Sequence, residues 1–366
     1  MNGARPGAVE APALHARRDP THFTRLGNMN PIRLLTAAAL AAGSLLLGPS
    51  SASASDCTVA APCVMRISTV APRGTPWAQQ MERIKTYIER ESGNRISVRT
   101  FLGSSAGEVS LARQCKDGAI EAIGVSTGAI AELVPQMGVF ELPFLFDTAE
   151  QADGVIDDHL FGPIETLLRN NGFQLFIFSE NGFRNFATSG NRPVRSGADL
   201  ASLQMRSQES WIHEEMYRAL GGQPVSIPVT EVSAALASGN VQGFDNTPLY
   251  SQAAGWHEFI DTWTVSNHIY QPAVVVYNKA WFDGLPADLQ QLLLQNRAEE
   301  TRRGRRDIRA INPMLMQNFG QFNVTVYTPT AAERSAMATA TRRVYDMFRQ
   351  RVQGGGALLD TVLQNR

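Results

Sequence analysis

Three polar side chains in the middle of the sequence have the chemistry to hold an anion together. Arg184 follows the apolar run Phe173–Phe178 through a Glu-Asn-Gly turn. Arg206 lies in a short strand-like segment, and Asn246 closes the strand-like segment Val241–Phe244. A guanidinium pairs with a carboxylate through two parallel hydrogen bonds, and the asparagine amide adds a donor. A single arginine more often lies on the surface, so the prediction depends on the three side chains converging at one sheet edge.

A different chemistry is suggested by the loop Gly103–Gly107, which matches the G-x-S-x-G motif of serine hydrolases and would make Ser105 a nucleophile. His257 and His268 follow in the required chain order. However, only two expected strands precede the motif, and five small residues suit any tight loop between a strand and a helix. A secreted serine esterase is therefore kept as an alternative, and a loop whose amides line a cleft is preferred.

Metal and nucleotide chemistry find no support in the sequence. The six histidines show no H-x-x-H or H-E-x-x-H spacing, and the three cysteines cannot form a four-cysteine zinc site. No G-x-G-x-x-G and no G-x-x-x-x-G-K-[ST] motif occurs. We expect no cofactor, no bound metal and no catalytic activity.

The elements that position these residues alternate between strands and helices. Strands are expected at Val64–Val70, Arg95–Phe101 and Ala119–Val125. One helix begins after the N-cap Thr75, and another ends at Gly118. This β-α-β-α-β order predicts a mostly parallel, doubly wound sheet. Ligands of such sheets bind beyond the carboxyl ends of the strands.

A second set of short strands and helices follows and predicts another α/β unit with its own core. It includes the segments around Arg206 and Asn246. Pro272–Tyr277 is an apolar run expected to form a buried strand, and Pro286 is expected to open a long helix that reaches about Ile311.

Composition excludes several classes of function. The chain has 366 residues, a formal net charge of −1, 43% hydrophobic residues and 18% charged residues. These values fit a globular protein and give no general attraction to nucleic acid or to anionic membranes.

The N-terminal segment is an export signal. Residues 34–47 form an apolar run that is too short to span a bilayer, with Arg33 before it and Ala52-Ser53-Ala54 after it. We predict a signal peptide over residues 29–54 with cleavage after Ala54. Residues 1–28 are interpreted as a non-native extension, with Met29 as the true start.

Export to an oxidising compartment would allow the neighbouring cysteines Cys57 and Cys63 to form a disulfide. Two free thiols are the alternative. Cys115 is expected to be buried on a helix face.

Several segments, in a consistent order, resemble the solute-binding subunits of TRAP transporters, the DctP type. The resemblance covers essentially the whole chain after the signal peptide. The matching segments include Glu141–Phe146 (ELPFLF), Asn181–Pro193 (NGFRNFATSGNRP), Leu203–Arg206 (LQMR), Ala219–Pro228 (ALGGQPVSIP), Glu231–Asn240 (EVSAALASGN), Gly243–Pro248 (GFDNTP), Asn267–Val276 (NHIYQPAVVV) and Leu285–Leu289 (LPADL).

This resemblance implies a two-domain fold like that of periplasmic binding proteins, with a mostly parallel sheet in each domain, crossing strands as a hinge and a long helix bridging the domains. The expected boundaries are 64–182 plus 271–310 for domain I and 183–270 plus 311–366 for domain II. The implied protein is periplasmic. It captures a small organic acid between its domains and delivers the acid to membrane permease subunits.

The resemblance also implies which residues bind the ligand. The arginine of the family's L-x-x-R strand, which binds the ligand carboxylate, matches Arg206, and a second arginine matches Arg184. The family's D-G-x-E-N-P motif reads QGFDNTP here, so Asn246 keeps its role while Asp245 replaces the usual glutamate.

Further ligand contacts are expected around these three residues. They are assigned to Trp77, Glu108 and Ser126 in the first domain and to the aromatic wall residues Trp211, Phe244 and Tyr270. So many aromatic side chains suggest a ligand with an apolar body. The sequence leaves open the identity of the acid and the oligomeric state. It also leaves open a role as the ligand-binding partner of a periplasmic sensor.

Overall fold

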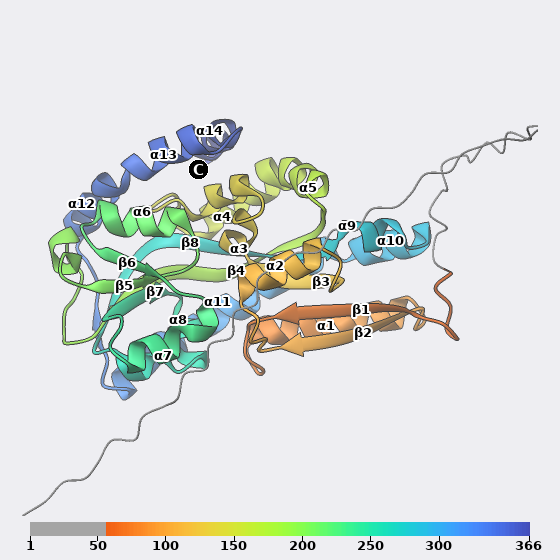
Figure 1. Cartoon of the computed structure of the whole chain (residues 1–366), viewed down its shortest axis with the longest axis horizontal. Coiled ribbons are helices and arrows are strands. Elements are labelled where there is room, and N and C mark those ends of the chain that lie inside the picture. The colour runs from red at the N-terminus through yellow and green to blue at the C-terminus, as the bar shows by residue number, and fades with distance from the viewer. Residues whose placement is uncertain (1–55) are drawn as a thin grey trace, which may run out of the picture. The chain divides into compact units, whose positions relative to one another are not determined.

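The computed structural model describes residues 56–366 (Figure 1). The predicted extension, signal peptide and cleavage site after Ala54 lie outside the described residues. Near the start of the described part, Cys57 and Cys63 form a disulfide with their Cα atoms 5.1 Å apart. The third cysteine, Cys115, is a buried free thiol, as expected.

Nine strands within residues 56–366 form one sheet in the order β2-β1-β3-β8-β4-β7-β5-β6, with β9 paired to β8. The parallel strands β2, β1 and β3 make up the first half of the sheet, and the parallel strands β7, β5 and β6 make up the second half. Their bounds are β1 (Cys63–Thr69), β2 (Ile96–Leu102), β3 (Ala122–Ser126), β4 (Phe173–Thr188), β5 (Gln204–Ser207), β6 (Gln223–Ser226), β7 (Gly243–Asn246), β8 (Thr262–Asn278) and β9 (Thr325–Tyr327).

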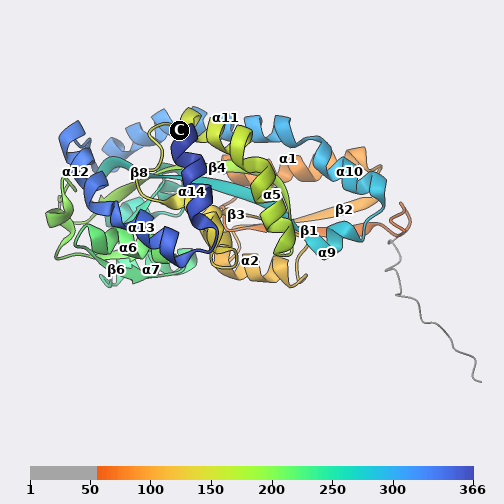
Figure 2. The ribbon, with the colours of Figure 1, turned by 90° about the horizontal axis from the view of Figure 1, so that it is seen from above.

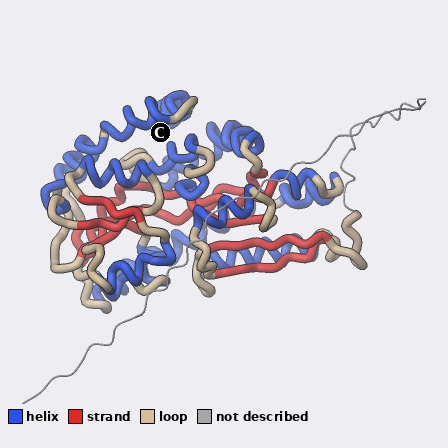
Figure 3. Tube along the Cα trace, viewed as in Figure 1, coloured by secondary structure: helices blue, strands red, loops and turns tan. Residues whose placement is uncertain are grey.

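The long strands β4 and β8 connect the two halves (Figure 3). They pair antiparallel from Phe173 opposite Asn278 to Thr188 opposite Thr262. The predicted Glu-Asn-Gly turn is wrong, because β4 continues through it as an irregularity in which Gly182 has a φ of 103°. A bulge absorbs the extra residue without ending the strand. These two strands are the crossing strands that the resemblance implies.

Helices cover both faces of the sheet (Figure 1). They are α1 (Pro76–Glu91), α2 (Glu108–Lys116), α3 (Thr127–Ala131), α4 (Ala149–Gly154), α5 (Phe161–Asn170), α6 (Trp211–Ala219), α7 (Val232–Ala237), α8 (Pro248–Ala253), α9 (Lys279–Asp283), α10 (Ala287–Gln295), α11 (Arg297–Gln321), α12 (Ala331–Thr341), α13 (Arg343–Arg351) and α14 (Gly355–Asn365). The N-cap prediction for α1 is confirmed, since the Thr75 side chain accepts from the Ala78 amide.

Alternation along β8 explains the two cores of the first half. Val274 and Val276 pack in a cluster with residues of α2, α5 and α14. Val275 and Tyr277 pack in the opposite cluster with residues of α1 and α10. Because successive side chains of a strand point to opposite faces, a continuous apolar run is buried on both sides.

The helix α11 bridges the molecule, because it contacts α1 beside the first half, the crossing strand β4, and α8 beside the second half (Figure 2). The single helix predicted from Pro286 to about Ile311 is interrupted at Asn296, and its second part extends to Gln321. No helix within residues 56–366 combines the length and apolar character needed to cross a bilayer.

Candidate functional site

A cavity lies where the carboxyl ends of strands from the two halves face each other. It contains about 620 Å³ of space free of atoms, including its mouth to solvent. The first half contributes residues that follow β1, β2 and β3, and the second half contributes residues at the ends of β5 and β7. This position follows from the topology, since loops at the carboxyl ends of parallel strands form the binding crevice of α/β proteins.

One of the two arginines that line this cavity is Arg206, on β5. Its side chain is buried, with a relative exposure of 2%, and its Nε donates to the Ile227 carbonyl at 3.0 Å. Among the described residues, no carboxylate oxygen lies within 4.0 Å of its guanidinium, and its two Nη atoms have no hydrogen-bond partner. Burial, reinforced by the positive charge of Arg184, lowers the pKa of Arg206 to about 10, so the group remains charged at neutral pH. A buried cation without a counter-ion is costly unless a ligand supplies an anion.

The second arginine of the cavity, Arg184, has a partner inside the protein. Its Nε donates to Asp245 Oδ2 at 2.5 Å, its Nη2 donates to the Asp245 carbonyl, and its Nη1 donates to Gln271 Oε1 at 2.9 Å. Nη1 also lies 3.5 Å from Asn246 Oδ1. Arg184 thus lines the cavity with most of its donors already used, and its contact with Asn246 orients that amide.

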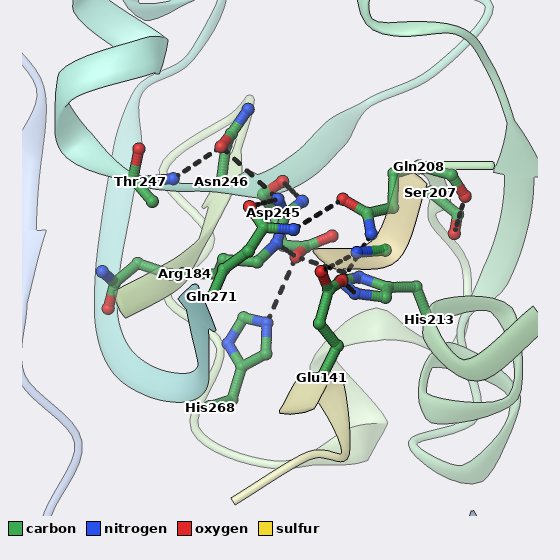
Figure 4. A network of polar contacts seen from close by, with 12 residues as sticks. Glu141, Arg184, Ser207, Gln208, His213, Asp245, Asn246, Thr247, His268 and Gln271 are labelled. Atoms are coloured by element: carbon green, nitrogen blue, oxygen red, sulfur yellow. Dashed lines mark hydrogen bonds and ion pairs between the residues drawn. The ribbon is translucent and has the colours of Figure 1, made fainter. Parts of the chain in front are cut away.

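A ring of polar contacts continues from Arg184 around the site (Figure 4). Gln271 Nε2 donates to Gln208 Oε1 at 3.0 Å, and Gln208 Nε2 donates to Glu141 Oε2 at 2.6 Å. His213 lies between two carboxylates, with Nε2 2.7 Å from Glu141 Oε2 and Nδ1 3.6 Å from Asp245 Oδ2. Because each amide of the ring is engaged at both ends, Gln208 and Gln271 are held in fixed orientations.

The carboxylate of Asp245 is the hub of this network. Tyr217 donates its hydroxyl to Oδ1 at 2.8 Å, and His268 Nε2 lies 3.4 Å from Oδ2. Burial alone would raise the pKa of Asp245, but the Arg184 charge and the two histidines hold it well below its usual range. Burial lowers the pKa of His268 to about 4, so its imidazole is neutral at pH 7.

Two further donors face the cavity beside Arg206. Asn246, at the end of β7, accepts from the Thr247 amide through Oδ1, and this leaves its Nδ2 without a partner among the described residues. Tyr250, on α8, lines the same cavity, and its hydroxyl makes no hydrogen bond within residues 56–366. Arg206, Asn246 and Tyr250 therefore supply the unpaired donors that a carboxylate requires.

The first half supplies the opposite wall. Trp77, Glu108 and Ser126 line the cavity, as expected from their positions after strands. The Trp77 indole N–H donates to Thr69 Oγ1 at 3.0 Å, so only its ring is presented. Both Glu108 oxygens accept from Ser126, from the amide at 2.9 Å and from the hydroxyl at 2.8 Å.

The three expected aromatic wall residues lie outside the cavity lining, which corrects that expectation. Phe244 is fully buried and packs edge-on against Trp256. Tyr270 is buried and donates its hydroxyl to Glu180 Oε2 at 3.1 Å. Trp211 packs on the core under the Arg351 guanidinium. Helical or strand position alone does not show whether an aromatic ring faces a core or a cleft.

Several lining residues were missed by the sequence reasoning, and Gln208, Gln271 and Tyr250 are among them. A signal existed for Gln208, because it follows Arg206 by two residues just beyond β5. Gln271 and Tyr250 gave no local signal, because their roles depend on strand pairing and on the direction of α8.

The hydrolase alternative is not supported by the geometry. Ser105 is exposed in the loop between β2 and α2, and neither His257 nor His268 contacts it. His268 is instead buried against Phe186, with its Nδ1 2.8 Å from the Ser266 hydroxyl. Within residues 56–366, no group of three or more His, Cys, Asp or Glu side chains is placed to hold a metal ion.

Comparison with known proteins gives consistent matches. Residues 67–351 match the family described as bacterial extracellular solute-binding protein, family 7 (DctP). A solute-binding protein of Verminephrobacter eiseniae is 30% identical over 273 residues, which cover 71% of this chain and 81% of that protein. The C4-dicarboxylate-binding periplasmic protein DctP of Rhodobacter capsulatus is 28% identical over 297 residues, which cover 80% and 89%.

A solved structure shows the same architecture. The sugar acid binding protein DctPAm of Advenella mimigardefordensis, crystallised in complex with galactonate, superimposes with a TM-score of 0.78 at 25% identity. The superposition covers 83% of this chain and 99% of that protein.

Proposed function

Because the chain belongs to family 7 of the bacterial extracellular solute-binding proteins, the DctP family, we propose that it captures a small organic acid in the cavity between the halves of its sheet and delivers that acid to membrane permease subunits. One relative is named as a C4-dicarboxylate-binding protein, and a structural relative holds galactonate. The proposed ligand therefore carries at least one carboxylate.

The observation that carries this proposal is the isolated charge of Arg206. Its guanidinium is buried and faces the cavity, with no carboxylate of the described residues within 4.0 Å. An incoming carboxylate would provide the missing counter-ion and accept two parallel hydrogen bonds from the Nη atoms. A charge-assisted bond of this kind contributes roughly 1.5–3 kcal/mol.

Two neighbouring donors complete the proposed carboxylate site. Asn246 Nδ2 and the Tyr250 hydroxyl would satisfy lone pairs that Arg206 leaves unfilled, which is what makes burial of an ion pair favourable. Arg184 acts as a positioning residue in this proposal, because its charge is neutralised by Asp245 and its Nη1 contacts the Asn246 oxygen. Its contribution to affinity comes through the orientation of Asn246.

Closure of the cavity would couple binding to recognition by the permease. The ligand would contact Arg206 on the second half and Glu108 or Trp77 on the first half at the same time. Contacts to both sides exist only when the halves approach, so a ligand favours the closed population. In this proposal the closed form is the one that the membrane subunits accept.

The proposal is tested by a thermal-shift screen of the exported protein against mono- and dicarboxylic acids. A ligand that binds only the folded state raises the melting temperature. We expect at least one organic acid to do so in the wild type and to lose the effect in Arg206→Ala. An Arg206→Ala protein that keeps the full shift would contradict the proposed site, and a screen in which no acid shifts the wild type would contradict the function.

Delivery is tested separately with the permease subunits reconstituted in vesicles. Uptake of the labelled acid should require this protein on the outside of the vesicle. Uptake that is equally fast without it would exclude the transport role.

A further inference from the structure

The cavity has two chemically different walls. The second half presents the cations and amides around Arg206. The lining from the first half is apolar apart from Ser126 and Glu108, and its apolar members are Val70, Ala71, Trp77, Val109 and Ala129. Glu108 is the sole charged side chain that this half brings to the cavity within residues 56–366.

The Glu108 carboxylate is held in place by hydrogen bonds and can still accept further ones. It begins α2, directly after the Gly103–Gly107 loop, and both of its oxygens accept from Ser126. The Ser126 hydroxyl also accepts from the Ala129 amide, so its orientation is fixed. No arginine or lysine of the described residues lies within 4.0 Å of the Glu108 carboxyl group. Each carboxylate oxygen has a second lone pair, which a ligand can use.

The other polar groups that the first half itself brings to this wall offer no free donor. The Ser126 hydroxyl proton is donated to Glu108, and the Trp77 N–H is donated to Thr69. Glu209, the second carboxyl group of the lining, lies on the opposite half, where the charge of Arg206 acts on it. Asn181 Nδ2, on the crossing strand β4, donates to Gln271 Oε1 at 3.4 Å, and the unpaired donors Asn246 Nδ2 and the Tyr250 hydroxyl belong to the proposed carboxylate site. Among the groups that the first half brings to the cavity within residues 56–366, a ligand group at Glu108 meets only acceptors, so the ligand supplies the proton of that contact.

We propose that the ligand is a monocarboxylate that carries a hydrogen-bond donor, a hydroxyl or an ammonium group, at the end remote from its carboxylate, and that Glu108 is the residue that selects it. This inference rests on the proposed function, in which Arg206 binds the carboxylate end. The donor would bind a Glu108 oxygen, while the apolar side chains of the first half contact the body of the ligand.

A dicarboxylate is disfavoured by the same geometry. Its second carboxylate would lie against Glu108 in a site where burial already raises the pKa of that group, so two negative charges would share a poorly solvated space. Like charges in such contact repel each other and weaken binding. The cavity therefore discriminates between acids of equal length by the group at their far end.

The experiment uses two sets of acids matched in carbon number and isothermal titration calorimetry. One set is butyrate, 4-hydroxybutyrate, 4-aminobutyrate and succinate, and the other is galactonate and galactarate. In the wild type, we expect a donor-bearing monoacid to bind at least about tenfold more tightly than the dicarboxylate of its set. Butyrate, which has no donor, should bind more weakly than its hydroxy or amino analogue.

The Glu108→Gln variant identifies the residue responsible. It removes the charge and adds an amide donor, so the preference over the dicarboxylate should shrink by at least about tenfold. If Glu108→Gln weakens the binding of 4-aminobutyrate alone, the donor of the ligand is an ammonium group. If it weakens the binding of 4-hydroxybutyrate and galactonate to a similar extent, the donor is a hydroxyl. Glu132→Gln, an exposed position at the end of α3, is the matched control and should change no affinity. Melting temperatures without ligand establish that both variants fold.

Several outcomes would overturn the inference. Tighter binding of a dicarboxylate to the wild type would do so, as would dicarboxylate binding with uptake of one proton, measured by titration in two buffers. Unchanged selectivity in a folded Glu108→Gln protein would also contradict it. In these cases, loss of binding in Arg206→Ala would still support the proposed function. If none of the acids binds the wild type, both the inference and the proposed function are wrong for these ligands.

Discussion

Arg184 and Asp245 form a buried ion pair in which the arginine Nε lies 2.5 Å from the carboxylate Oδ2. Arg184 lies on the crossing strand β4, and Asp245 lies on β7, the strand of the second half that pairs antiparallel with β4. The pair neutralises one of the two arginines in the cavity, whereas Arg206 has no carboxylate partner within 4.0 Å among the described residues.

The carboxylate affinity should depend on the shape of the Arg206 side chain as well as on its charge. Arg206→Ala should weaken binding by roughly ten- to hundredfold, because a charge-assisted bond is lost. Arg206→Lys should also weaken it, since one ammonium cannot replace a planar fork. Calorimetry with the acid found in the screen measures both. Arg218→Ala, on the exposed face of α6, is the control, and equal affinity in Arg206→Ala and Arg218→Ala would refute the assignment.

Removal of Arg184 should reduce stability in the absence of ligand. Arg184→Met leaves the Asp245 carboxylate buried without its partner, and breaking such a pair costs about 3–5 kcal/mol. Arg206→Met removes a cation that has no carboxylate partner, so its free energy of unfolding should remain close to that of the wild type or exceed it. Urea unfolding at pH 7 compares the two. If the free energy of unfolding fell more in Arg206→Met than in Arg184→Met, the distinction between the two arginines would be contradicted.

Acid should destabilise the fold through His268. Burial lowers its native pKa to about 4, and an unfolded histidine titrates near 6.5. Between these values the unfolded chain binds the extra proton, so the free energy of unfolding falls as the pH drops from about 6.5 to 4, on the order of 3 kcal/mol for this group. The titratable and charged groups that act on it are Asp245, Arg184 and His213.

Urea unfolding at several pH values measures this effect. The stability of His268→Gln should depend less on pH over that interval, whereas His257→Gln, at a partly exposed position, should behave like the wild type. An identical loss of stability in wild type and His268→Gln would show that other groups are responsible.

The Tyr250 hydroxyl should make a measurable contribution to affinity. Tyr250→Phe keeps the ring and removes one donor from the proposed carboxylate site, so the dissociation constant should rise about two- to tenfold. Tyr345→Phe removes a buried hydroxyl that bonds the Pro143 carbonyl outside the cavity lining, and it should leave affinity unchanged. Calorimetry that finds equal affinity in Tyr250→Phe and wild type would exclude this contact.

The sequence by itself determined the family and the class of fold, and it predicted where a candidate site would form. Family motifs occur in one order along the chain, and the match over residues 67–351 confirms that resemblance. Apolar runs and caps such as Thr75 act locally, so the parallel strands and α1 were predictable within a few residues. Arg206 and Asn246 were expected at the carboxyl ends of strands, and both lie there.

Only the tertiary structure decided which of the predicted site residues form ion pairs inside the protein, which line the cavity and which are buried in a core. The bulges that carry β4 past Gly182 and its pairing with β7 bring Arg184 to Asp245, and no local pattern specifies this register. The same applies to Phe244 and Tyr270, whose rings are buried in cores that form between distant segments. The domain boundaries drawn from the resemblance stay a prediction. Ion pairing and burial depend on distances between residues that are far apart in the chain, and only folding sets those distances.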